Sequence, residues 1–180
     1  MEELVEKARK GDKEAFTTLI LSLEKDLYKI AKVRLKNDDD IYDVLQETII
    51  IAFKSVKNLR KTQYFKPWII KILVNQSNAV YRQKYCKKII SFEDIEDTTV
   101  DKIYDLENIE LNLDFNLLCN KLAYEDRIII ILYYMEKFTD KEIGKILNLK
   151  ENTVKTKRVR AKQKIKNILK LGGKYDGWIW

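Results

Sequence analysis

The sequence predicts an all-α fold, and three observations support this prediction. The chain has 180 residues, of which five are Gly and one is Pro, so it is poor in the residues that build β-turns. Apolar residues recur at spacings of three and four along most of the chain, as they do on one face of a helix. The hydrophobic fraction of 46% is sufficient for one medium domain or two small ones.

The composition argues against several classes of protein. The chain contains no His, and Cys86 and Cys119 have no CxxC partner, so we expect neither a zinc site nor a disulfide. We find no nucleophile motif and no Gly-rich phosphate loop, and we therefore predict a protein that is not an enzyme and has no cofactor. The longest undiluted apolar run, IIIIL at 128–132, is too short to cross a bilayer, and the charged N-terminus does not resemble a signal peptide. We expect a cytoplasmic protein without membrane insertion.

The charge is segregated along the chain. Residues 1–90 hold 19 basic and 12 acidic residues, residues 91–126 hold 2 and 11, and residues 139–174 hold 12 and 3. This order predicts two basic modules joined by an acidic connector, with nucleic acid as the default partner of the modules. Any single lysine is equally well explained as solvated surface. The expected division is a helical domain over 1–90, a flexible acidic linker over 91–112, a helix-turn-helix domain over 113–172 and a tail over 173–180.

The segment DIYDVLQETIIIAF, residues 40–53, is expected to be a helix with one acidic and amide face. Asp43, Gln46 and Glu47 fall on that face at helical spacing. Such a face without metal-ligand spacing is typical of a protein contact. Ordinary solvated surface remains the alternative.

The segment FKPWIIKILVNQSNAVYRQ, residues 65–83, is expected to be a helix with a polar face for nucleic acid. Basic side chains suit phosphates, and Asn suits base edges. The residues of this face follow each other at spacings of four, three and four. They are Lys71, Asn75, Asn78 and Arg82.

Aromatic residues lie at the start of the same segment. Tyr64, Phe65 and Trp68 are candidate stacking surfaces for unpaired bases. Such residues more often belong to a core, and for Trp68 we favour the core.

Two helices and a tight turn are expected after residue 138. Thr139 followed by Glu142 forms a capping box, so a helix should begin there. Gly144 has no side chain and would allow a second helix to approach closely. Residues 148–149 break the apolar pattern, and a new helix is expected from about Glu151.

On a helical wheel, Val154, Ala161 and Ile165 form the buried face of this last helix. The opposite face mixes short polar, apolar and basic side chains with lysines along its rims. That arrangement suits a helix in the DNA major groove, as in a helix-turn-helix, although an amphipathic helix with solvated lysines is the alternative. The candidate contacts are Lys155, Thr156, Lys157, Val159, Arg160 and Lys162.

These motifs together resemble a known family. EIGKILNLKENTVKTKRVRAKQKI resembles the C-terminal helix-turn-helix of bacterial sigma-70-type RNA polymerase sigma factors, in particular the extracytoplasmic-function (ECF) group. GDKEAFTTL at 11–19 is similar to the GDxxAFxxL that opens the family. The segments 40–53 and 65–83 are similar to its DAEDLVQETFLKAW and FRxWLxxIAxNxxxDxxR, and the blocks stand in family order over roughly residues 5–170.

The resemblance implies a sigma factor with a sigma2-like helical bundle and a sigma4-like helix-turn-helix. Its partners would be promoter DNA and core RNA polymerase, including the β′ coiled coil and the β subunit, with an anti-sigma factor as a candidate regulator. Asp43, Gln46 and Glu47 would bind polymerase, the polar face of 65–83 with the preceding residues 60–66 would melt and read the −10 element, and the exposed face of 151–164 would read the −35 element. The acidic linker would pass through the active-site cleft and RNA exit channel of polymerase.

Two other functions remain open from the sequence. One is a stand-alone dimeric helix-turn-helix transcription regulator that binds two half-sites without polymerase. The other is a pure interaction module, against which the basic face of the last helix argues.

Overall fold

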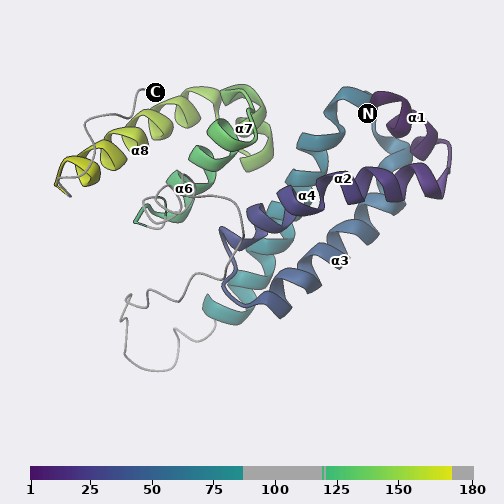
Figure 1. Ribbon diagram of the computed structural model, residues 1–180, viewed down its shortest axis with the longest axis horizontal. Coiled ribbons are helices and arrows are strands. Elements are labelled where there is room, and N and C mark those ends of the chain that lie inside the picture. Colours follow the sequence, from purple (N-terminus) through teal and green to yellow (C-terminus); the bar gives the residue numbers. More distant parts are fainter. Residues whose placement is uncertain (87–118, 120, 172–180) are drawn as a thin grey trace.

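The computed structural model describes residues 1–86, 119 and 121–171 (Figure 1). Every regular element in this part of the chain is helical, which confirms the predicted all-α fold. The helices form an N-terminal unit, α1 to α4, and a C-terminal unit, α6 to α8. The predicted linker over 91–112 and tail over 173–180 lie outside the described residues, and the domain boundaries stay predictions.

In the N-terminal unit, the three long helices α2, α3 and α4 pack against one another, and α1 packs across α2. A π-helical turn over Arg82–Cys86 follows α4, and 3-10 turns over Val56–Asn58 and Thr62–Tyr64 separate α3 from α4. The helices are α1 (Glu2–Arg9), α2 (Lys13–Lys32), α3 (Asp38–Ser55) and α4 (Phe65–Tyr81).

The starts of α2 and α3 are fixed by side chains that accept hydrogen bonds from the first turn. The Asp12 carboxylate accepts from the backbone N–H of Ala15 at 2.9 Å, and the Asn37 amide oxygen accepts from that of Asp39 at 2.7 Å. Each satisfies a backbone donor that the helix itself cannot pair. Gly11, with φ +98°, makes the turn between α1 and α2 in a conformation that side chains disfavour.

The C-terminal unit comprises α6 (Tyr124–Ile130), which continues as a π-helical turn over Ile131–Met135, then α7 (Asp140–Leu147) and α8 (Glu151–Leu171). The predicted capping box is confirmed. The backbone N–H of Glu142 donates to the Thr139 hydroxyl at 3.3 Å, and the backbone N–H of Thr139 donates to the Glu142 carboxylate at 2.9 Å.

The turn between α7 and α8 depends on Gly144. Asn148 ends α7 in the left-handed conformation (φ 56°), and the backbone N–H of Leu149 then donates to the carbonyl of Gly144 at 2.9 Å. A Cβ at Gly144 would lie 2.7 Å from the carbonyl oxygen of Leu149. The sequence predicted a close approach of a second helix here, and the structure confirms it: the nearest group is the carbonyl of Leu149 in the turn, and the backbone nitrogen of Glu151, the first residue of α8, follows at 3.6 Å from the same Cβ position.

The two units share one apolar core. Helix α4 packs on α2 and α3 on its own unit and on α7 of the other (Figure 1). The fully buried Ile69, Ile70 and Leu73 of α4 belong to the same cluster of side chains as Ile128 and Ile143 of the C-terminal unit. The sequence predicted two domains but gave no sign that they pack together.

We predict that Gly144→Ala destabilises the protein. Ala normally stabilises an exposed helix interior by about 1 kcal/mol relative to Gly. At this position the added methyl group would lie too close to the carbonyl oxygen of Leu149, and such overpacking destabilises a protein by about 1–3 kcal/mol. Urea unfolding should therefore show a net loss of up to about 2 kcal/mol. The control is Lys141→Ala at an exposed site of α7, where a change within about 0.5 kcal/mol is expected. A Gly144→Ala protein more stable than wild type would contradict this prediction, because it would show that the turn between α7 and α8 moves to accommodate the methyl group.

Candidate nucleic-acid and polymerase-binding surfaces

The first half of α8 presents the predicted outward face to solvent. Val154 and Ala161 are fully buried and Ile165 nearly so, which confirms the predicted inner face and fixes the rotation of the helix. Val159 lies on the outer side with 56% of its surface exposed, and an exposed apolar side chain of this kind suits contact with a thymine methyl group. The other predicted contacts that are exposed are Lys155, Thr156, Arg160 and Lys162.

Lys157 is the predicted contact whose surroundings differ from the rest. Its ammonium lies 2.7 Å from the Glu125 carboxylate at the start of α6, and its side chain is 32% exposed. The hydrogen bond to Glu125 raises the pKa of Lys157, although burial opposes this. Lys164 is held in the same way, 2.7 Å from Asp126. The positive charge on the side of α8 that faces α6 is thus partly neutralised, and these two lysines hold the helix in position against α6.

The opposite part of the face carries cations that no ion pair holds in the described part of the chain. Among the described residues, no carboxylate lies within ion-pair distance of Lys155, Arg160 or Lys162. A surface with unpaired cations and few acids attracts phosphates, and the attraction weakens as salt increases.

Arg158 connects α8 to α7. Its Nε and Nη2 donate to the two carboxylate oxygens of Asp140, both at 2.8 Å, and its guanidinium lies 3.9 Å from the centre of the Tyr133 ring. The hydrogen bonds to Asp140 raise the pKa of Arg158 further above its ordinary value. The pairing of Arg158 with Asp140, 18 residues away along the chain, was not predicted from the sequence.

The predicted −10 face lies along one side of α4. Lys71, Asn75 and Arg82 are exposed, so the structure brings three of the four residues to one free stripe. The fourth, Asn78, is half-buried.

Of the three aromatic residues before this stripe, none lies fully exposed. Phe65 is 1% exposed and belongs to the core, so it is not available to stack on a base. Trp68 is half-buried and packs on the core, in agreement with the preferred assignment. Tyr64 is half-buried, and the ammonium of Lys145 from α7 lies 5.3 Å from the centre of its ring.

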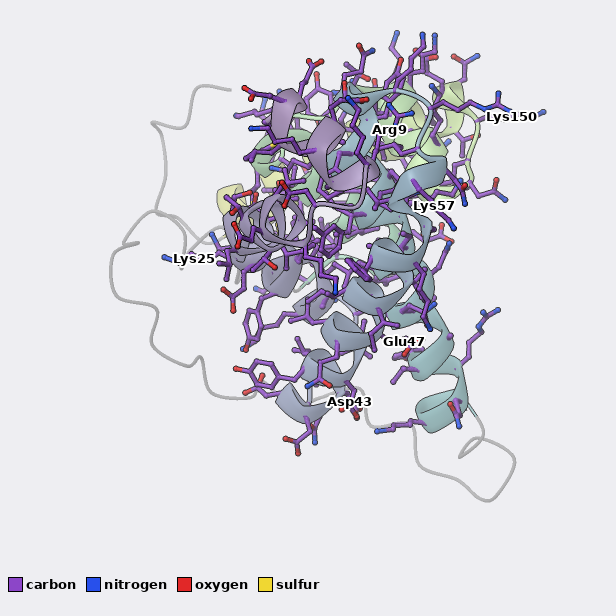
Figure 2. All side chains as sticks on the ribbon, turned by 90° about the vertical axis from the view of Figure 1, so that its right-hand side faces the viewer. Arg9, Lys25, Asp43, Glu47, Lys57 and Lys150 are labelled. Atoms are coloured by element: carbon purple, nitrogen blue, oxygen red, sulfur yellow. The ribbon has the colours of Figure 1, made fainter. Side chains whose placement is uncertain are left out.

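The predicted polymerase face is exposed on α3. Asp43 and Glu47 point outward from the helix in Figure 2, and Gln46 is exposed beside them. The opposite side of this helix is buried through Val44 and Thr48.

The sequence analysis missed an apolar continuation of this face. Ile50 and Phe53 are 44% and 45% exposed, and with Phe16 they line a shallow hollow whose rim includes Lys13 and Lys54. A signal was present in the run of three isoleucines at 49–51, because three consecutive residues of one helix cannot all face one core.

The described residues contain no group of three or more His, Cys, Asp or Glu side chains that would hold a metal ion. Cys119 is buried, and burial raises the pKa of its thiol to about 12, so the thiolate needed for nucleophilic chemistry is disfavoured. No helix in the described part of the chain is long and apolar enough to span a bilayer.

Two family models match the chain, one in each unit. Sigma-70 region 2 matches residues 19–85, and Sigma-70, region 4 matches residues 114–165. The chain is 32% identical over 155 residues to RNA polymerase sigma factor SigV of Bacillus subtilis. The aligned region covers 86% of this chain and 91% of that protein. It is 27% identical to the ECF RNA polymerase sigma-E factor of Escherichia coli, with 91% of each chain covered.

Solved structures show the same arrangement of helices. The sigma factor RpoE from Bartonella quintana, crystallised with the anti-sigma factor NepR, superposes with a TM-score of 0.72 at 22% identity, over 86% of this chain and 96% of that one. CnrH in complex with the cytosolic domain of CnrY superposes with a TM-score of 0.68 at 19% identity, over 94% and 97% of the two chains.

We predict that Asp140 and Arg158 are strongly coupled in stability. Their side chains are 14% and 16% exposed and form a two-point contact, so a double-mutant cycle with Asp140→Asn and Arg158→Met should give a coupling of about 1–3 kcal/mol in urea unfolding. The matched control is the more exposed Lys157 and Glu125 pair, for which we expect less than about 1 kcal/mol. Equal couplings for the two pairs would contradict a special role of Arg158 in holding α8.

Proposed function

This chain belongs to the sigma-70 family of RNA polymerase sigma factors, in its ECF group, and we propose how its surfaces divide the work of that function. It is a sigma factor that binds core RNA polymerase and directs transcription initiation at promoters. In this proposal the N-terminal unit binds polymerase and the −10 element, and the C-terminal unit binds the −35 element. It acts in the cytoplasm as a specificity subunit and is not itself an enzyme.

The observation that carries the proposal is the pair of exposed polar and basic surfaces on one chain, the outer face of α8 and the stripe on α4. On α8, Arg160 is exposed beside Val159, so a base-edge donor and an apolar contact lie next to each other. Lys155 and Lys162 flank them and would contact phosphates, which set affinity and not sequence preference.

The exposed Lys71 lies before Asn75 on α4, and the exposed Arg82 lies after it, at the start of the π-helical turn that follows α4. Lys71 and Arg82 could bind the phosphates of a DNA strand while Asn75, which lies between them, hydrogen-bonds to a base edge. We therefore assign this stripe, with Asn78, to the −10 element.

The polymerase-binding surface is assigned to α3. Asp43, Gln46 and Glu47 offer acidic and amide groups, and the exposed Ile50 and Phe53 extend the surface with apolar area. An interface that combines a buried apolar centre with a polar rim is typical of protein–protein contacts. The proposed occupant is the β′ coiled coil, with the β subunit as a second contact of the protein.

A stand-alone dimeric regulator is not favoured. The family matches extend over both units, and the relatives that cover most of this chain are sigma factors. If the N-terminal unit served only for dimerisation, it would have no reason to resemble Sigma-70 region 2. Because the structural neighbour RpoE was solved with the anti-sigma factor NepR, we propose that an anti-sigma factor is also a partner of this chain.

We predict that the purified protein makes core RNA polymerase start transcription at defined sites in vitro. Asp43→Arg reverses one charge in the proposed polymerase surface and should reduce these transcripts about tenfold or more, while binding to a −35 duplex is retained. The control is Glu24→Arg, the same charge change at an exposed position of α2. Normal transcription by Asp43→Arg would remove Asp43 from the surface. If the wild-type protein gave no transcripts but bound a palindromic duplex, the stand-alone regulator would be supported.

We predict different effects for Arg160→Ala and Lys162→Ala in the −35 contact. Loss of Arg160 should relax the preference at one base pair by about 1–3 kcal/mol, because a base-edge contact is removed. Loss of Lys162 should weaken binding to all sequences and reduce the salt dependence by about one counterion. Binding titrations over single-base variants of the element and several salt concentrations separate the two. Equal losses on every duplex for both variants would show that Arg160 does not read bases.

A further inference from the structure

The lysines of α8 lie in two rows, one on each side of its outer face. Val154, Ala161 and Ile165 are buried and fix the inner side of the helix. At 100° per residue, one row lies at roughly 80–120° from Val154 and the other at roughly 280–300°. The two rows flank the residues proposed to read bases, so each would face one of the two phosphate backbones of a groove. The first row is Lys155, Lys162 and Lys166, and the second row is Lys157 and Lys164.

The second row is held by two consecutive acids in the first turn of α6, which packs beside α8 (Figure 1). The Lys157 ammonium lies 2.7 Å from the Glu125 carboxylate, and the Lys164 ammonium lies 2.7 Å from that of Asp126. The Asp126 side chain is 11% exposed, so departure of Lys164 would leave a nearly buried carboxylate without a cation. Lys164 is therefore held firmly in place.

The pair of Lys157 and Glu125 is more exposed, but it carries no net charge toward DNA. The Glu125 side chain is 61% exposed. If Lys157 moved from Glu125 to a phosphate, the carboxylate would remain uncompensated beside the same backbone. Both charges would lie within one Debye length of that phosphate, about 10 Å at 0.1 M salt, so the repulsion from the acid would offset the attraction of the cation.

The first row differs, because the acid next to it is paired with another residue. Asp140 of α7 accepts hydrogen bonds from Arg158 on both of its carboxylate oxygens, at 2.8 Å each. Arg158 lies between the buried side of α8 and the first row, so it neutralises Asp140 without the use of a lysine. In the described part of the chain, none of the three exposed lysines of the first row takes part in an ion pair.

Lys166 is the member of the first row that the sequence analysis did not select. It is exposed and lies one turn beyond Lys162. Lys155 and Lys166 are 11 residues apart. At 1.5 Å per residue the row is about 16 Å long, and several successive phosphates of one strand occupy that length at about 3.4 Å per nucleotide. Glu151 begins α8 one turn before this row but forms no ion pair with it in the described residues.

We propose that the first row binds one phosphate backbone of the −35 duplex, and that Glu125 and Asp126 withhold the second row from the other backbone. This proposal rests on the proposed function. It adds Lys166 to the DNA-binding residues and makes Glu125 a determinant of affinity for the −35 element. Phosphate contacts carry no sequence information, so Glu125 lowers the affinity for every duplex alike and leaves base preference to the centre of the outer face.

Binding titrations of the full chain over several salt concentrations test this arrangement. The probes are a duplex with the −35 element mapped by transcription in vitro and an unrelated duplex of the same length. Glu125→Gln frees Lys157 and should bind both duplexes roughly three- to tenfold more tightly, with a salt dependence steeper by about one counterion. The control is Glu24→Gln, which removes the same charge at an exposed position of α2 and should stay within about twofold of wild type.

A matched pair of variants then separates the two rows. The double variant Glu125→Gln, Lys157→Gln replaces a neutral pair with two neutral side chains and should bind both duplexes as the wild type does. Lys166→Gln removes one cation of the first row. It should weaken binding to both duplexes roughly three- to tenfold and reduce the salt dependence by about one counterion. Lys166 and Glu125 are exposed, so neither change disturbs the core.

Three outcomes overturn the proposal. Binding by Glu125→Gln that equals that of Glu24→Gln would show that Glu125 does not restrain Lys157. A double variant as weak as Lys166→Gln would show that Lys157 binds a phosphate in the complex. Wild-type binding by Lys166→Gln would remove this residue from the DNA surface. In each case, transcripts made with the wild-type protein leave the sigma function intact, whereas absence of those transcripts contradicts the proposed function instead.

Discussion

Burial of α4 on two sides is the constraint on which the rest of the structure depends. Ile69 and Ile70 are consecutive, so their side chains diverge by about 100°, and yet both have no exposed surface. One layer of helices cannot cover both directions. Helices α2 and α3 cover one side and α7 another, which leaves a single narrow stripe of α4 open to solvent. Function follows from this geometry, because the stripe holds the polar residues assigned to the promoter.

The basic C-terminal segment shows that charge counts alone do not describe a binding surface. Lys157 and Lys164 are paired with the acids of the first turn of α6, and Arg158 is paired with Asp140. These cations orient α8 against its neighbours. Lys155, Arg160 and Lys162 carry the charge that remains for DNA, and they surround the exposed Val159. Helix α8 thus carries two sets of cations, one that fixes its position against α6 and α7 and another that is available to bind DNA.

Sequence reasoning succeeded where the determinants are local. The capping box of Thr139 and Glu142 and the buried stripe through Val154 and Ala161 depend on spacings within one helix, and both are confirmed. The partner of Arg158 was not predictable, because Asp140 lies on another helix, 18 residues away along the chain. Within the candidate site, the exposure of the side chains was predicted well for the outer face of α8 and less well for Asn78, which is half-buried.

The polar contact between the two units adds little to the net stability of their packing. The ammonium of Lys66 lies 2.8 Å from Asp26 of its own unit and 2.9 Å from Glu136 of the C-terminal unit. Desolvation offsets most of the attraction in such a buried ion pair, but loss of one partner leaves a costly unpaired charge. The apolar cluster that α4 shares with α7 therefore supplies most of the free energy with which the units pack.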